Sequence, residues 1–382
     1  IIEVMEKIIN PFLIKGYAGK ELFCDREQEL DILYKNVCNG VDTTLISPRR
    51  IGKTGLILRF FDYLKEKAWG ECVYVDIYAS RNLEDLVRLL AEAILLKFPE
   101  KTNIGKRFMT FLKGLRPLIG YDALTGEPQV QIVYQMAQEK ENTLKGVLDF
   151  LDSQNVNIVL AIDEFQQITE YPEQNMEALL RTYIQQLKNI RFIFSGSQRA
   201  MMLEIFSNAN RPFFASTQYL AIEKIQQDVY ATFITDLFER YGKQIDPNCV
   251  AEILNWSRRH TFYTQSLCNR IFAMGTSHVT TEQVKWACSD LLERNEPVFL
   301  QYRQLLTPIQ WNFLIAIAKE HEVKQISAQH FISKYGIGSP ANARRLAKAM
   351  IEKELVLETV DKTGVTYQVY DVFFSRWLER EY

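Results

Sequence analysis

A short loop between a predicted strand and a predicted helix limits the folds open to this chain more than any other segment. Residues 43–46 are rich in β-branched side chains, and residues 54–65 carry apolar side chains at helical spacing. Between them lies the sequence SPRRIGKT, residues 47–54. It matches the pattern GxxxxGK[ST] except at the first position, where Ser47 stands in place of glycine. We therefore predict a phosphate-binding loop between a strand and a helix.

The chemistry of phosphate binding assigns a role to each residue at the end of this loop. Backbone amides at a helix N-terminus attract phosphate oxygens, a lysine spans the outer phosphates, and a hydroxyl coordinates Mg²⁺. Lys53 and Thr54 supply the last two groups. Ser47 leaves open how the loop begins, because a position that needs positive φ favours glycine. The residues expected to contact a nucleotide here are Pro48, Arg49, Arg50, Ile51, Gly52, Lys53, Thr54 and Gly55.

An acidic pair follows a second apolar segment. Residues 157–162 (NIVLAI) predict a strand that is covered on both faces, and Asp163 and Glu164 come directly after it. Ligands of open α/β sheets bind at this end of the strands. We predict that Asp163 holds Mg²⁺ through water and that Glu164 polarises the attacking water. An acidic pair is also a common helix start, but Lys53 in the preceding loop favours the catalytic interpretation.

The order of the remaining patterns predicts three domains. Strand-like segments alternate with amphipathic helices up to residue 222, including a helix and a hairpin within 101–134, so we expect an α/β domain with a parallel sheet and helices on both faces. Residues 223–298 read as helices only, at 227–241, 249–255, 263–272 and 281–294. Residues 299–382 contain three helical segments and a hairpin, which is the pattern of a winged helix. The predicted boundaries are 1–222, 223–298 and 299–382.

Composition excludes several classes of protein. The 382 residues include 45 Lys and Arg against 47 Asp and Glu, so a formal net charge of -2 rules out a generally basic nucleic-acid binder. The six cysteines include no CxxC pair, and we predict no zinc site. No apolar run is long enough for a membrane helix, and charges interrupt the opening segment where a signal peptide would be apolar. We expect a cytoplasmic protein that does not bind membranes.

Four segments together carry a resemblance to a known family. They are FCDREQEL, SPRRIGKT, VLAIDEFQQI and FIFSGSQRAMM. The chain resembles the archaeal-type ATPase family of the AAA+ and STAND branch of P-loop NTPases from about residue 10 to the end. The order of nucleotide domain, helical lid and winged helix is also similar to that of archaeal origin-recognition proteins. The resemblance implies ATP or ADP as ligand, Mg²⁺ as cofactor, and a sheet in which the strand before Ser195 lies between those before Ser47 and Asp163.

The resemblance also implies roles for residues outside the two motifs. Phe23 and Arg26 match the segment beside the adenine, although this segment is equally typical of a helix capped by Asp25. Ser197 matches a sensor position that contacts the γ-phosphate or the attacking water, and a serine after glycine is also an ordinary turn residue.

An arginine that the family places before its fifth strand is missing, since Ala215 and Ser216 occupy that position. Arg211 and Arg199 are the nearest substitutes, in the same subunit or across the interface of a homo-oligomer, and either is also typical of a surface ion pair. In the lid, Arg258 and Arg259 are candidates for a second sensor.

The last domain leaves two partners open. Residues 300–382 contain 11 Lys and Arg against 9 Asp and Glu, a mild excess. Arg344, Arg345 and Lys348 lie on the predicted recognition helix, and Lys362 lies at the hairpin tip, where each is placed to meet double-stranded DNA. Winged helices also bind proteins. The chain as a whole is therefore predicted to be either an ATP-hydrolysing enzyme or a nucleotide-gated DNA- or protein-binding switch with negligible turnover.

Overall fold

The computed structural model describes residues 10–115, 117–122, 124–132, 137–361 and 364–382. The chain forms two compact units. The first is Lys15–Lys224, and the second is Ile225–Tyr382 together with residues 10–14. Each unit is described on its own.

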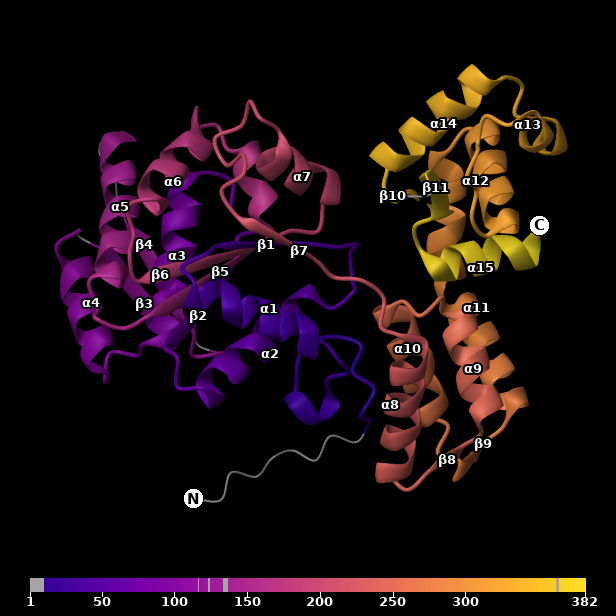
Figure 1. The fold of residues 1–382 in the computed structure, drawn as a ribbon, viewed down its shortest axis with the longest axis horizontal. Helices are drawn as coiled ribbons and strands as arrows, with labels where there is room; N and C mark the ends of the chain where they lie inside the picture. Colours follow the sequence, from indigo (N-terminus) through magenta and orange to yellow (C-terminus); the bar gives the residue numbers. More distant parts are fainter. Residues whose placement is uncertain (1–9, 116, 123, 133–136, 362–363) are drawn as a thin grey trace. The chain divides into compact units, whose positions relative to one another are not determined.

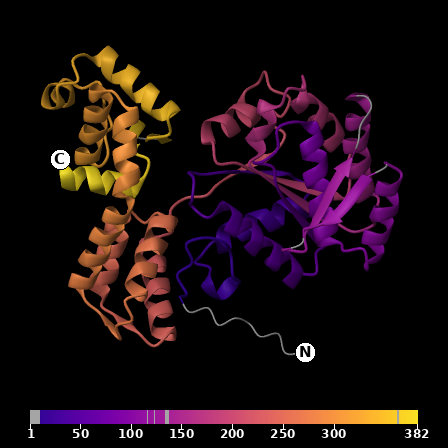
Figure 2. The ribbon, with the colours of Figure 1, turned by 180° about the vertical axis from the view of Figure 1, so that it is seen from behind.

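The first unit is built on a five-stranded parallel sheet (Figures 1 and 2). Its spatial order is β2-β5-β6-β1-β7. The strands are β1 (Thr43–Ile46), β2 (Glu71–Asp76), β5 (Ile158–Asp163), β6 (Ile190–Ser195) and β7 (Gln218–Ala221). Every residue of β5 is buried, because helices cover both faces of the sheet and leave no polar face. The predicted fold class is confirmed, and β6 lies between β1 and β5 as the family resemblance implied.

Two hydrophobic cores hold helices on opposite faces of the sheet. The core that contains Leu45, Val159 and Ile193 joins the sheet to α1 and α2, and the core that contains Leu160, Ile162 and Phe192 joins it to the other helices. The helices are α1 (Glu27–Cys38), α2 (Lys53–Glu66), α3 (Leu83–Lys97), α4 (Asn103–Lys113), α5 (Ala137–Asp152), α6 (Met176–Ile184) and α7 (Arg199–Ser207), with short 3-10 turns η1 (Lys20–Leu22) and η2 (Phe165–Glu170). The hairpin predicted within 101–134 is β3 (Pro117–Tyr121) with β4 (Pro128–Ile132). Sequence patterns had not indicated α7.

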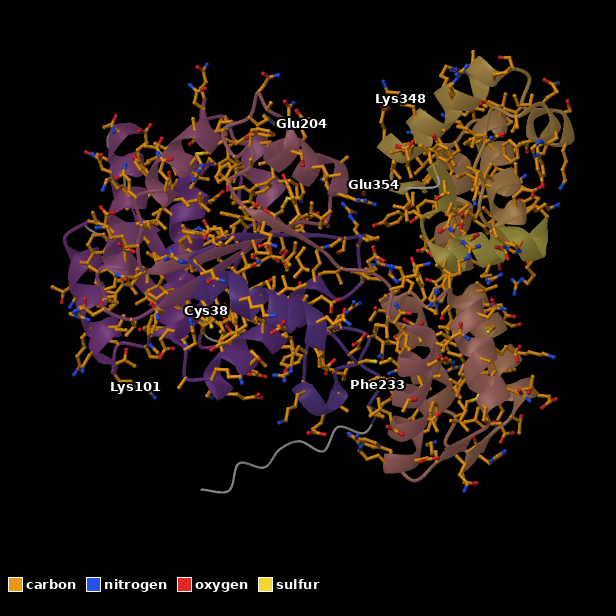
Figure 3. The ribbon with its side chains drawn as sticks, in the orientation of Figure 1. Cys38, Lys101, Glu204, Phe233, Lys348 and Glu354 are labelled. Atoms are coloured by element: carbon orange, nitrogen blue, oxygen red, sulfur yellow. The ribbon has the colours of Figure 1, made fainter. Side chains whose placement is uncertain are left out.

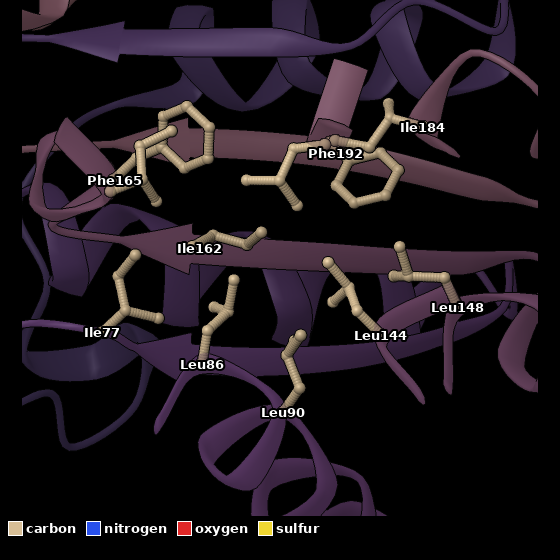
Figure 4. A pocket seen from close by; sticks show the side chains of 11 residues that line it. Ile77, Leu86, Leu90, Leu144, Leu148, Ile162, Phe165, Ile184 and Phe192 are labelled. Atoms are coloured by element: carbon tan, nitrogen blue, oxygen red, sulfur yellow. The ribbon is translucent and has the colours of Figure 1, made fainter. Parts of the chain in front are cut away.

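The larger core contains a small gap beneath β5 (Figure 4). Its volume is about 10 Å³, and all of its lining side chains are apolar, among them Ile77, Leu90 and Leu148. A space of that size holds at most one water molecule, and a water there would find no hydrogen-bond partner. The gap is therefore a packing defect and not a ligand site.

The second unit contains two groups of helices. The first group is α8 (Gln227–Arg240), α9 (Pro247–Trp256), α10 (Thr261–Phe272) and α11 (Thr281–Leu305), with the two-residue strands β8 (Gln244–Ile245) and β9 (His278–Val279). The second is α12 (Pro308–Glu320), α13 (Gln329–Tyr335), α14 (Pro340–Glu352), the hairpin β10 (Val356–Asp361) and β11 (Gly364–Val369), and α15 (Val372–Glu381). The strands β8 and β9 correct the expectation that the residues after 222 carry no strand before the winged helix.

Helix α11 joins these two groups without a break. The sequence predicted that it ends at Arg294, before Pro297, but the helix continues to Leu305 with Pro297 inside it. Proline removes one helical hydrogen bond, and tertiary packing offsets that loss. Phe299 is buried against Phe374 and Trp377 of α15. A single core therefore runs through both groups, so the last helix, which the sequence analysis did not identify, is central to the packing.

No helix in the described ranges combines the length and the apolar character needed to cross a lipid bilayer. All six cysteines are free thiols, in agreement with the absence of CxxC pairs.

Asp42, directly before β1, gives the stability of the first unit a dependence on pH. Its carboxylate accepts a hydrogen bond from the Phe192 amide at 2.8 Å, while burial raises its pKa to about 6. Because this pKa is raised above its unfolded value, the associated stability is complete below about pH 4 and is lost as pH rises through 6. The loss is on the order of 3 kcal/mol.

We predict that Asp42→Asn removes this dependence. Urea unfolding gives the free energy of unfolding of each protein, and the value for the variant is subtracted from that for wild type. This difference should fall between pH 4 and 6 and stay level above pH 7. A difference that does not depend on pH would contradict the assignment.

Candidate active site

The parallel register of the sheet brings three strand ends to one edge. Leu45 pairs with Ser195 across β1 and β6, and Ile162 pairs with Phe194 across β5 and β6. The loop after β1, the acidic residues after β5 and the polar end of β6 therefore meet, as expected for the ligand-binding edge of an open α/β sheet.

The loop after β1 has the backbone that a phosphate site requires. Gly52 is the N-cap of α2 with φ 107, a conformation that glycine adopts without strain. Ser47 is buried with negative φ, and its hydroxyl donates to the Pro48 carbonyl at 3.1 Å. The loop thus opens without the glycine that the motif usually carries. Arg50 does adopt a left-handed backbone, with φ 59, and Ile51 packs into the core beside α1 and α2.

Lys53 is the first residue of α2 and is only 7% exposed. Burial lowers the pKa of its ammonium group. The negative charges of Asp163 and Glu164 act in the opposite direction and raise this pKa. Within the described residues, the ammonium group makes no hydrogen bond and no ion pair shorter than 4 Å. A buried cation without a bonded anion at a helix N-terminus fits a phosphate group, which would supply the missing negative charge.

Asp163 is the most heavily hydrogen-bonded side chain of the site. Its Oδ2 accepts from the Thr54 and Tyr74 hydroxyls, each at 2.9 Å. Its Oδ1 accepts from the Glu164 amide at 3.0 Å and from the Ser195 hydroxyl. Thr54 is exposed, so the pair formed by Thr54 and Asp163 is open to solvent on one side.

The oxygens of Thr54 and Asp163 fit a magnesium ion. Among the described residues, no three His, Cys, Asp or Glu side chains gather into a metal cluster. Mg²⁺ does not require such a cluster, because it commonly binds to one or two protein oxygens and keeps several waters.

Glu164 is held in a strained position beside this pair. Its backbone is left-handed, with φ 56. Its Oε2 accepts from the Gln166 side-chain amide at 2.6 Å, from the Ser197 hydroxyl at 2.7 Å and from the Ser197 amide at 3.2 Å. Left-handed backbone at a residue other than glycine costs about 1 kcal/mol or more and persists where surrounding bonds fix it. Glu164 and Ser197, predicted as catalytic base and sensor, are therefore in direct contact.

Asp76 ends β2 in register with Asp163. Burial, together with the charges of Asp163 and Glu164, raises the pKa of Asp76, and its carboxylate accepts from the Tyr78 amide at 2.9 Å. It therefore caps the turn after the strand, next to the two acids of the site.

The segment predicted to lie beside the adenine divides into two parts. Phe23 is half-buried and close to the first turn of α2, since a side chain added at Gly55 would lie 3.4 Å from its ring. Arg26 is instead buried in structural contacts, with bonds of 2.7 Å to the Glu29 carboxylate and to the Glu223 carbonyl. The cap prediction was wrong, because Arg26 and not Asp25 is the N-cap of α1, and it makes no side-chain cap bond.

Two of the candidate arginines, Arg211 and Arg258, have carboxylate partners. Arg211 forms an ion pair of 2.9 Å with Glu177, a carboxyl whose pKa burial raises. Arg199 is the first residue of α7. Arg258 pairs at 2.9 Å with Glu379 on α15 within the second unit. The structure therefore uses Arg211 and Arg258 as ion-pair partners, and no bond links either to the loop after β1 in the described part of the chain.

The basic residues of the last domain lie on one exposed face. Arg344, Arg345 and Lys348 are exposed on α14, opposite its buried face. Figure 3 labels Lys348 on this helix. Among the described residues, none of the three is paired with a carboxylate, and Arg345 donates to the Asn342 side chain at 2.9 Å. Lys362 lies outside the described residues.

Three further residues of the site were missed by the sequence analysis. They are Tyr74, Gln166 and Ser195, which hold the two acids. Position alone indicates Ser195, since it ends a strand before Gly196. The sequence around Tyr74 and Gln166 gives no comparable indication. The strand register brings Tyr74 to Asp163, and the turn η2 brings Gln166 to Glu164.

Comparison with known proteins agrees with this geometry. A family model described as an ATPase domain predominantly from Archaea matches residues 23–257. The chain belongs to this family. A second model, described as a probable winged helix domain, matches residues 297–380. No curated protein matches the chain.

Solved structures share the fold over nearly the whole length. The Walker-type ATPase PABY2304 of Pyrococcus abyssi is 18% identical, with a TM-score of 0.65, over 96% of this chain and 99% of that chain. The Aeropyrum pernix ORC2 protein, in its ADPNP-ADP complexes, is 14% identical, with a TM-score of 0.58, over 97% of this chain and 95% of that chain. The predicted order of ATPase domain and winged helix is thereby confirmed at the level of the fold.

Gly196 leaves the space that Gln166 needs to reach Glu164. A Cβ at this position would lie 2.1 Å from Gln166 Oε1 and 2.7 Å from the Met202 sulfur. We predict that Gly196→Ala lowers the free energy of unfolding by about 1–3 kcal/mol, a typical cost of overpacking. Urea unfolding measures the change. The matched control is Gly120→Ala on an open strand position, and an equal loss in both variants would contradict the prediction.

Proposed function

We propose that this chain is a magnesium-dependent ATPase whose nucleotide state is coupled to its winged helix domain. The observation that carries the proposal is the 2.9 Å bond between the Thr54 hydroxyl and the Asp163 carboxylate. It joins the helix start that carries Lys53 to the strand end that carries Glu164. Membership of the ATPase family and the aromatic ring of Phe23 beside α2 support adenine as the base. Within that family, assignment to the STAND branch remains a prediction.

Each residue of the site has a role in this reaction. Lys53 and the first-turn amides of α2 bind the phosphates, and Thr54 and Asp163 hold Mg²⁺. When bound, the ion offsets phosphate charge and polarises the phosphoryl oxygens. Glu164 Oε2 is occupied by Gln166 and Ser197, whereas its Oε1 accepts no hydrogen bond within the described residues. Oε1 is thus the atom that orients the attacking water and takes its proton.

The second unit suits the transmission of a nucleotide-dependent change. The pair between Arg258 and Glu379, and the Arg376 guanidinium that donates to the Trp256 carbonyl at 3.0 Å, tie the helices before α11 to α15. We infer that the lid and the winged helix move as one body.

A binding switch with negligible turnover is the second candidate. It is favoured by the three donors on Glu164 Oε2 and by the pairing of Arg211 with Glu177, which leaves that arginine engaged away from a nucleotide. Arg211 acting in trans within a homo-oligomer would restore the first candidate, so turnover measurements decide between the two.

Phosphate release and ATP binding separate the roles of two residues. Lys53→Ala should lose both, because it removes the cation that faces the phosphates. Glu164→Gln should retain binding while its turnover falls by roughly 10²–10⁴, the usual contribution of a positioned base. Malachite-green phosphate detection and fluorescent-nucleotide titration provide the measurements. A wild type that binds ATP tightly but releases no phosphate, alone or with DNA, would establish the switch instead.

We also propose that α14 binds the backbone of double-stranded DNA through its basic face. Affinity for DNA falls as salt rises, and each phosphate contact that is lost should make the plot of log affinity against log salt less steep by about one. Arg344→Ala combined with Arg345→Ala in the full chain should therefore weaken duplex binding and make this plot less steep by about two. Fluorescence anisotropy over a salt series measures both effects. Arg380→Ala on α15, whose side chain pairs with Glu381, is the control. Binding that does not depend on salt, or no binding, would favour a protein partner.

A further inference from the structure

The phenol of Tyr74 is an additional donor on the candidate magnesium ligand. Tyr74 lies on β2, in register with Ala161 of β5, and its side chain is half-buried. Its hydroxyl donates to the same oxygen, Asp163 Oδ2, that receives the Thr54 hydroxyl. Strand pairing fixes the position of the tyrosine, so this contact does not depend on a mobile loop.

Donors from the protein fill all the acceptor positions of the Asp163 carboxylate. A carboxylate offers about four lone-pair positions, two on each oxygen. In the described residues, Thr54 and Tyr74 occupy Oδ2, while Ser195 and the Glu164 amide occupy Oδ1. An ion, or a water bound to it, therefore reaches this carboxylate only when one donor turns away.

Thr54 is the donor that is free to turn. It is exposed, and its own oxygen is the group expected to face the ion. The Ser195 side chain is fully buried, and the Glu164 amide is part of the backbone. Rotation of the Thr54 hydroxyl opens one position on Oδ2, on the side of the phosphate loop, while the other three bonds keep the carboxylate fixed.

We propose that Tyr74 is a positioning residue that limits Asp163 to one acceptor position beside Thr54 and thereby favours Mg²⁺ over Ca²⁺. This inference rests on the proposed function. Mg²⁺ requires near-octahedral geometry with short bonds and keeps its waters, so a single well-placed oxygen suits it. Ca²⁺ takes six to eight oxygens at longer distances and often binds a carboxylate through both oxygens. Ser195 and the Glu164 amide fill Oδ1, and Tyr74 fills one position of Oδ2, so Asp163 offers an ion a single lone pair and does not bind it through both oxygens.

The test compares Tyr74→Phe with wild type in metal-dependent ATP binding. ATP affinity is measured by titration calorimetry in EDTA and over Mg²⁺ and Ca²⁺ series. We expect the Mg²⁺ concentration for half-maximal effect to rise about tenfold, as is usual when a residue behind a metal ligand is lost. The Ca²⁺ value should stay level or fall, and ATP affinity in EDTA should not change.

Tyr171→Phe is the matched control, because it removes a buried phenol bond of 2.5 Å to Ser80 in the same unit, away from Asp163. It should leave the ratio of Mg²⁺ to Ca²⁺ requirement unchanged, whereas a general loss of stability would move both variants alike.

The outcomes distinguish this inference from the proposal on which it rests. A wild type that binds no ATP in Mg²⁺ would overturn the proposed function. A wild type with the expected Mg²⁺ dependence, alongside a Tyr74→Phe variant with the same Mg²⁺ to Ca²⁺ ratio, would overturn the role of Tyr74 alone. If thermal melting shows that Tyr74→Phe does not fold, Ser195→Ala replaces it. That variant also frees a position on Asp163 and should raise the ratio of Mg²⁺ to Ca²⁺ requirement, and an unchanged ratio would again overturn the inference.

Discussion

The carboxylate of Asp163 organises the edge of the sheet on which the proposed chemistry depends. Its bonds reach the first turn of α2 through Thr54, the strand β2 through Tyr74 and the end of β6 through Ser195. Hydrogen bonds to a charged acceptor contribute about 1.5–3 kcal/mol each when they are shielded from water. One side chain thus connects the helix that follows β1 to both neighbours of β5, and the position of the candidate metal site follows from the strand order.

Beside Asp163, the geometry of Glu164 is maintained at a cost. A left-handed backbone is unfavourable at glutamate, and the donors from Gln166 and Ser197 offset that strain. Gly196 is part of the same arrangement, since any side chain there would occupy the space of the Gln166 amide. These contacts hold the carboxylate whose charge raises the pKa of Lys53, a buried side chain that makes no ion pair within the described residues.

The second unit shows that one helix can pass through a boundary read from composition. Pro297 marks a change in sequence character, yet α11 passes through it, and Phe299 packs against α15. Arg258, which motif comparison suggested as a nucleotide sensor, instead forms an ion pair with Glu379. Burial lowers the pKa of this arginine, and the nearby carboxylate opposes the shift, so the pair stabilises the contact between helices.

Local sequence determined the parts of this protein that depend on neighbouring residues. The loop from Ser47 to Thr54, the apolar strand before Asp163 and the alternation of strands and helices could all be predicted, because backbone preference and hydrophobic period act over a few residues. Only the tertiary structure decided which side chains reach the two acids. Tyr74 and Ser195 are distant from Asp163 in sequence, and the strand register brings them to it. It likewise engaged Arg26 and Arg211 in ion pairs that the motif does not reveal, and the buried guanidinium of Arg26 requires such a partner.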